Sequence, residues 1–137
     1  MSDRCYFQMT VLKKDVKQIN EIMFDGQSGD WAGVTDNNDG TVTLIDYEAN
    51  YGYGTETGKL AEAGIVFKGF HGYGGEYGEC RFACYNKKHT CVNSIQGGPV
   101  VFVSRSGIDE AGLKHVKEYY ATLDSVEKQF KDNGEKQ

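Results

Sequence analysis

The chain contains no apolar run that approaches the ~18 consecutive residues needed to cross a bilayer, which excludes a helical membrane protein. Its first residues, from Met1 to Cys5, lack the apolar stretch of a secretory signal. We therefore expect a cytoplasmic protein that does not interact with membranes. Hydrophobic residues make up 39% and charged residues 26% of the chain, and proline occurs once, which excludes a collagen, a coiled-coil rod and a wholly disordered tail.

The length of 137 residues fits a single domain. A chain of this size can bury roughly two-thirds of its unfolded surface, so it needs no disulfide or metal to fold. We expect residues 1–133 to form this domain and residues 134–137 to form a frayed tail.

Basic residues are missing from one long stretch. No lysine or arginine occurs between Gln18 and Gly58, although eight acidic residues do, and the whole chain carries a net charge of -5. A nucleic-acid backbone is bound by clustered lysine and arginine, so direct nucleic-acid binding by this stretch is not expected. An acidic surface favours a protein partner with a basic surface. The alternative is that these acids are turn residues and solvated strand faces.

Cysteines are few, at Cys5, Cys80, Cys84 and Cys91, which does not fit the disulfide scaffold of a small secreted protein. Their spacing matches none of the usual zinc-binding motifs. We predict no metal, no cofactor and no obligatory disulfide. If a hairpin turned at Lys87 and Lys88, Cys84 would lie opposite Cys91, at a distance compatible with a bridge.

Apolar periodicity predicts strands and helices in an order typical of an α+β protein. The predicted arrangement is a single domain with a mostly antiparallel sheet and helices packed on one face. A ferredoxin-like core with an inserted hairpin is the first candidate. The predicted strands are 6–12, 31–35, 41–49, 65–70, 80–86, 89–95 and 100–104, and the predicted helices are 15–24, 59–63 and 109–132.

Glycine and tyrosine concentrate in the middle of the chain. Nine of the 18 glycines and five of the nine tyrosines lie between Tyr47 and Gly78, mainly in two loops at 50–58 and 69–78. Glycine lets backbones approach closely, and tyrosine offers a large, rigid contact area with a polar tip. This composition predicts a recognition surface, although bulges and tight turns would also use such glycines. The predicted partner-binding residues are Asp36, Asp39, Asp46, Glu48, Tyr51, Tyr53, Tyr73 and Tyr77.

A second hypothesis assigns a polar pocket to His71 and Glu76 together with the loop tyrosines. A histidine beside a glutamate can act as a general base, so this pocket would belong to a small ligand-binding domain or an enzyme. The sequence places no serine or cysteine nucleophile beside this pair. A binding protein without catalytic activity is therefore the first expectation.

Three blocks, at 48–52, 60–67 and 69–78, resemble small uncharacterised proteins of phages and other mobile elements. The resemblance covers the middle third of the chain and includes no catalytic motif. It implies an accessory protein that modulates a host system, such as an anti-CRISPR or another anti-defence inhibitor. In that setting the acidic face would imitate nucleic acid toward a nucleic-acid-binding host complex.

Overall fold

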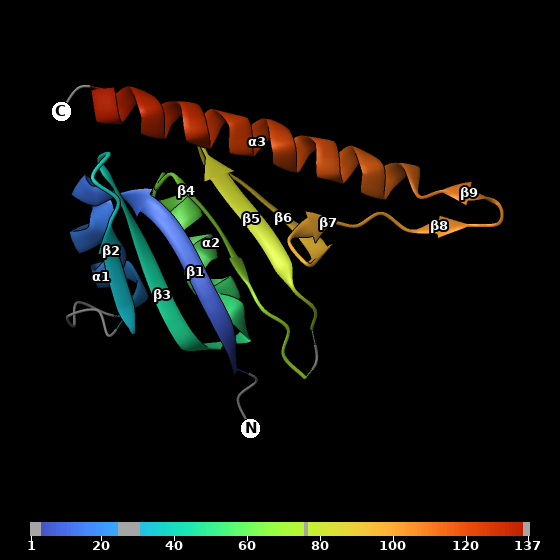
Figure 1. The fold of residues 1–137 in the computed structure, drawn as a ribbon, viewed down its shortest axis with the longest axis horizontal. Helices are drawn as coiled ribbons and strands as arrows, with labels where there is room; N and C mark the ends of the chain where they lie inside the picture. Colours follow the sequence, from blue (N-terminus) through green and yellow to red (C-terminus); the bar gives the residue numbers. More distant parts are fainter. Residues whose placement is uncertain (1–3, 25–30, 76, 136–137) are drawn as a thin grey trace.

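The computed structural model describes residues 4–24, 31–75 and 77–135. These residues form a seven-stranded antiparallel sheet, a separate two-stranded hairpin and three α-helices, which confirms the predicted α+β class (Figure 1). The elements are β1 (Arg4–Leu12), η1 (Lys13–Asp15), α1 (Val16–Met23), β2 (Gly33–Asp36), β3 (Thr41–Asn50), η2 (Tyr51–Tyr53), α2 (Gly54–Glu62), β4 (Phe67–His71), β5 (Cys80–Tyr85), β6 (Lys88–Ile95), β7 (Gly98–Pro99), β8 (Val103–Ser104), β9 (Gly107–Ile108) and α3 (Glu110–Glu135).

The strand order in the main sheet is β2-β3-β1-β4-β5-β6-β7, and each neighbouring pair is antiparallel. The first four strands and the two helices between them follow the β-α-β-β-α-β order of a ferredoxin-like core. This topology agrees with the sequence expectation. The additional β5–β6 hairpin comes after the fourth strand and widens the sheet at its β4 edge, so it is not inserted within the core.

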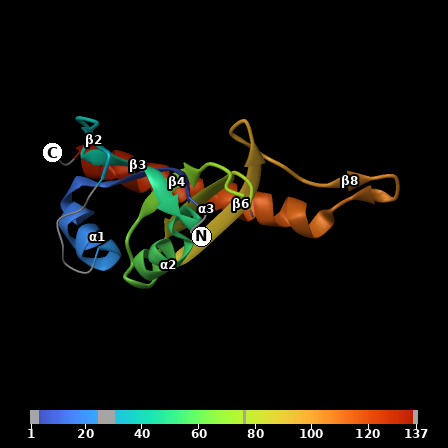
Figure 2. The same cartoon turned by 90° about the horizontal axis from the view of Figure 1, so that it is seen from below.

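Apolar side chains cover both faces of the sheet. On one face, Phe7 and Met9 of β1 pack with Ile19 of α1 and Leu60 of α2. On the other face, α3 packs onto Ala83, Val92 and their neighbours through a stripe that the sequence predicts: Val116, Tyr119, Leu123, Val126 and Phe130. Figure 2 shows α1 and α2 on one side of the strands and α3 on the other. The expectation that the helices lie on one face is therefore wrong for α3.

The β5–β6 hairpin turns one residue earlier than the sequence suggests. Asn86 and Lys87 form the two-residue turn with left-handed φ values of 51° and 66°, because asparagine tolerates this conformation and a two-residue hairpin requires it. Cys84 consequently pairs with His89 rather than with Cys91. A disulfide joins Cys91 to Cys80, and their Cα atoms are 6.5 Å apart, so the expectation of no obligatory disulfide is also corrected.

Helix α3 is capped at its start and is longer than predicted. The Asp109 side chain accepts a hydrogen bond from the Gly112 backbone N–H at 3.1 Å, as an N-cap residue does. The helix continues to Glu135, so Gly134 and Glu135 form its last turn and not a frayed tail, whereas residues 136–137 lie outside the described residues. Within the described part of the chain, no helix combines the length and apolarity that a membrane span requires.

Candidate partner-binding surface

The two loops rich in glycine and tyrosine meet at one end of the sheet. The rings of Tyr51 and Tyr77, one from each loop, have centroids 6.1 Å apart, and Tyr77 also packs edge-on against His71 at 5.5 Å. Gly52 permits this contact: its φ is +62°, and a Cβ atom there would lie 2.7 Å from the His71 ring. The loops therefore form one continuous surface.

Several tyrosines on this surface point into solvent. The exposed fractions are 79% for Tyr73, 66% for Tyr47 and 49% for Tyr51. The tilted rings of Tyr47 and Tyr6 of β1 have centroids 5.8 Å apart. The backbone N–H of Gly72 donates to the Tyr6 carbonyl, which holds the second loop beside β1. We call this surface the tyrosine end and define it as Tyr47, Glu48, Tyr51, Tyr73 and Tyr77.

Tyr53 and Asp46 lie beneath the tyrosine end and contact each other. The Tyr53 ring is half-buried and packs edge-on against Phe7 at 5.0 Å and Trp31 at 6.1 Å. Its hydroxyl donates to the Asp46 carboxylate, which also accepts the Glu48 backbone N–H at 2.9 Å. The backbone pairing of β1 with β3 shifts register at this point. These two side chains thus fix the bulge that orients Glu48.

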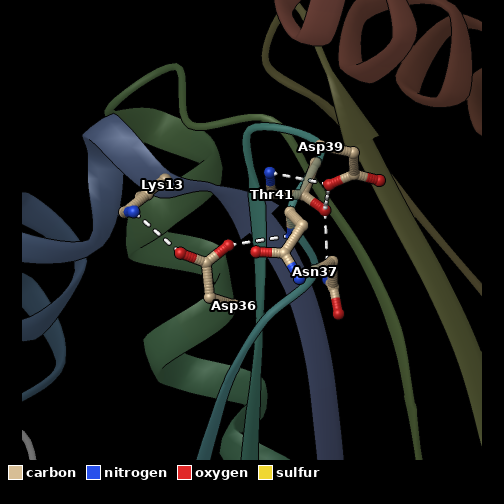
Figure 3. Close-up of polar contacts among 6 residues, drawn as sticks. Lys13, Asp36, Asn37, Asp39 and Thr41 are labelled. Atoms are coloured by element: carbon tan, nitrogen blue, oxygen red, sulfur yellow. Dashed lines mark hydrogen bonds and ion pairs between the residues drawn. The ribbon is translucent and has the colours of Figure 1, made fainter.

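At the opposite end of β3, Asp36 is the last residue of β2 and Asp39 lies in the turn between β2 and β3 (Figure 3). Asp36 accepts hydrogen bonds from the Lys13 ammonium at 2.7 Å and from the Asn38 backbone at 2.9 Å, and the bond from Lys13 is the main cause that lowers its pKa. Asp39 accepts the Thr41 hydroxyl and backbone N–H, and the hydroxyl bond lowers the pKa of Asp39. Both carboxylates therefore stabilise the turn.

The predicted acidic stretch does not form a single face. Asp39 and Glu48 are separated by almost the whole of β3, roughly 30 Å at the rise of a strand. Two of the acids also meet basic residues from outside the stretch: Asp36 pairs with Lys13, and Glu48 lies 3.4 Å from Arg4. A count of charges along the sequence could not show these pairs, because they depend on β1 and its end lying beside β3.

The structure holds His71 within the tyrosine end. His71 is half-buried, its ring lies between Gly52 and Tyr77, and its Nδ1 is 2.9 Å from the Gly72 carbonyl oxygen. Glu76, its predicted partner, lies outside the described residues. The two cavities between α3 and the sheet are lined by other side chains.

A second exposed surface was not predicted. The chain from Val100 to Ile108 forms the β8–β9 hairpin, which projects beyond the sheet at the start of α3 (Figure 1). Phe102 and Val103 are 73% and 68% exposed. We call residues 100–108 the apolar arm. The residues from Ser104 to Gly107, which follow a Val-Phe-Val run, are typical of a turn, whereas the sequence pattern predicts only a single strand at 100–104.

Comparison with protein-family models, with curated proteins and with solved structures finds no match to this chain.

Proposed function

We propose that this protein is a non-enzymatic binding protein that presents its tyrosine end to a protein partner. The observation that carries the proposal is the exposure of Tyr47, Tyr51 and Tyr73 around two loops that pack against each other. Tyrosine contributes a large contact area for little lost side-chain entropy, and its hydroxyl can bond to the partner. Buried aromatic residues also tend to dominate the energy of protein interfaces.

The proposed partner has a basic surface. The net charge of -5 favours approach by such a surface, mainly through the association rate. The side chains of Arg4 and Glu48 are 54% and 72% exposed, and an ion pair of this kind contributes little to stability. A partner lysine or arginine could therefore replace Arg4 beside Glu48 at small cost.

A narrower form of the proposal is an inhibitor of a host defence system, such as a nucleic-acid-binding complex, acting in the cytoplasm. Its support is the resemblance of the middle third of the chain to small phage proteins, together with the stretch of 18–58 that lacks basic residues. The dispersion of the acids along β3 favours a local contact at Glu48 over imitation of a long nucleic-acid backbone.

The proposal is tested by capture from a lysate of bacterial cells with the tagged protein, followed by quantitative mass spectrometry. The test variant combines Tyr51→Ala, Tyr73→Ala and Glu48→Lys, and the control is Tyr120→Ala, a tyrosine of α3 that is 46% exposed. We expect a protein with a basic surface that binds the wild type and the control and loses at least tenfold in affinity for the triple variant. If every captured protein binds the triple variant equally well, the proposal is wrong.

A further inference from the structure

A cleft lies where α3 crosses the sheet. Two neighbouring cavities, of about 690 and 240 Å³, share Thr10 of β1, Lys68 of β4 and Glu127 of α3 in their linings. The smaller cavity lies over β1, β4 and β5, and the larger one extends to the β2–β3 turn at Asn37. A small-molecule site in a protein commonly has a volume of several hundred Å³.

The strand register places the polar side chains of this cleft on one face. Thr10 pairs with Lys68, and Gln8 pairs with Phe70, which in turn pairs with Arg81 of β5. Side chains alternate across a strand, so these residues point to the α3 face while Met9 and Phe82 are buried in the core on the opposite face. The spacing of two residues in each strand therefore builds the floor of the cleft.

Arg81 is the unusual member of this floor. Its guanidinium lies 5.0 Å from the centroid of the Phe70 ring, and its Nε is buried without a hydrogen-bond partner among the described residues. None of the ion pairs among the described residues involves Arg81. Gly97 leaves room for this group, because a Cβ atom there would lie 2.9 Å from Nη2. The guanidinium interacts with the Tyr119 side chain and with the Glu79 carboxylate, so the missing acceptor concerns Nε alone. A buried donor atom without an acceptor is costly, and an ordered ion or water molecule is one explanation for it.

The neighbouring groups add further donors. The Lys68 ammonium is 3.6 Å from Glu127, the one carboxylate that lines the smaller cavity, and Arg81 interacts electrostatically with the Glu79 carboxylate outside this lining. The Tyr6 hydroxyl donates to the Gln8 Oε1 at 3.0 Å, which leaves the Gln8 amide nitrogen as a donor. The smaller cavity therefore combines two cationic donors with a neutral amide donor.

We propose that this cleft binds a small molecule through a phosphate or carboxylate group held by Arg81 and Lys68. Both oxyanions match the fork of a guanidinium, and lysine adds a point charge. The larger cavity holds the remainder of the molecule, which is polar because Asn37, Asn38 and Asp39 line that end. The site shares no residue with the tyrosine end, so this inference does not depend on the proposed function.

The test is a titration followed by ¹H–¹⁵N NMR at constant ionic strength, including the arginine Nε–Hε signals. The probes are inorganic phosphate, ribose 5-phosphate and gluconate. Comparing ribose 5-phosphate with gluconate distinguishes a phosphate from a carboxylate, and comparing it with inorganic phosphate shows whether the hydroxylated part of the molecule contributes to binding. We expect saturable shifts of the Arg81 Nε–Hε signal, with a Kd of about 1 mM or lower for at least one hydroxylated probe.

Two variants and a control decide the result. Lys68→Gln and Arg81→Gln should each weaken binding at least tenfold, and Lys68→Gln keeps the test valid if loss of Arg81 unfolds the protein. Lys117→Gln, at an exposed position of α3 that lines neither cavity, should bind as the wild type does. Absence of saturable shifts with all three probes, or equal binding by Lys68→Gln and wild type, overturns the proposal.

Discussion

At the scale of single residues, the buried thiol of Cys84 shows how packing changes chemistry. Cys84 is fully buried in the core that contains Phe67 and Phe82. Burial disfavours the thiolate and raises the pKa of Cys84 to about 11. Alkylating reagents attack the thiolate, so this residue should be inert in the folded protein.

We predict that iodoacetamide leaves Cys84 unmodified at pH 8 in the native protein and modifies it quickly in urea. Because the folded state holds the proton more tightly, the contribution of this thiol to stability is present below its ordinary pKa and declines as the pH rises toward 11. Peptide mass spectrometry of alkylated samples measures the first effect. Rapid labelling of Cys84 at pH 8 without unfolding would contradict the assignment.

At the scale of secondary structure, periodicity predicts most elements because burial on one side repeats every two or about 3.6 residues. Strand β1 and helix α3 follow such patterns over nine and 26 residues and were predicted close to their observed bounds. The errors in the predicted strand pairing arise at a turn, where the conformation of single residues sets the register. The register of β5 with β6 depends on which residue pair adopts positive φ, and a shift of one residue moves every pairing.

The candidate site was predictable to a similar extent. The clustering of glycine and tyrosine indicates a surface, and the structure brings the two loops together through Tyr51 and Tyr77. The sequence could not show that Asp46 bonds to Tyr53, or that Lys13 and Arg4 reach the acids, since these contacts join different elements. The cleft at Arg81 was also missed, because its residues come from β1, β4, β5 and α3.

The corrected register yields a prediction for the β5–β6 hairpin. The disulfide between Cys80 and Cys91 spans 11 positions of the chain, and closing a loop of similar length stabilises a protein by roughly 3 kcal/mol at most. We expect the oxidised protein to weigh two hydrogen atoms less than the reduced one, and reduction to lower its free energy of unfolding by about 1–3 kcal/mol in urea titrations. The double variant Cys80→Ser, Cys91→Ser should not respond to reductant. If protein kept without reductant has the same mass as reduced protein, the disulfide between Cys80 and Cys91 is absent.

At the scale of the whole molecule, one sheet contributes side chains to two hydrophobic cores, one on each of its faces. Strand β5 contributes Phe82 to the core under α1 and α2, and it contributes Ala83 to the core under α3. An amphipathic pattern shows that a helix buries one stripe but not which face of a sheet it covers, so the side taken by α3 could not be predicted. Because α3 lies mainly over β5 and β6, it borders the cleft instead of sealing the whole face.

Because both hydrophobic cores pack on the same sheet, we predict that they unfold together. Val126 of α3 is fully buried in the second core, and Val126→Ala should cost about 2 kcal/mol through lost burial and a small cavity. Trp31, the only tryptophan, reports on the first core: it packs against Phe7 and donates to Asn20 at 2.8 Å. We expect Val126→Ala to shift the urea midpoint of Trp31 fluorescence and of far-ultraviolet circular dichroism equally, as two-state unfolding requires. A Trp31 transition that stays at the wild-type midpoint while the dichroism shifts would show instead that α3 detaches from a core able to stand without it.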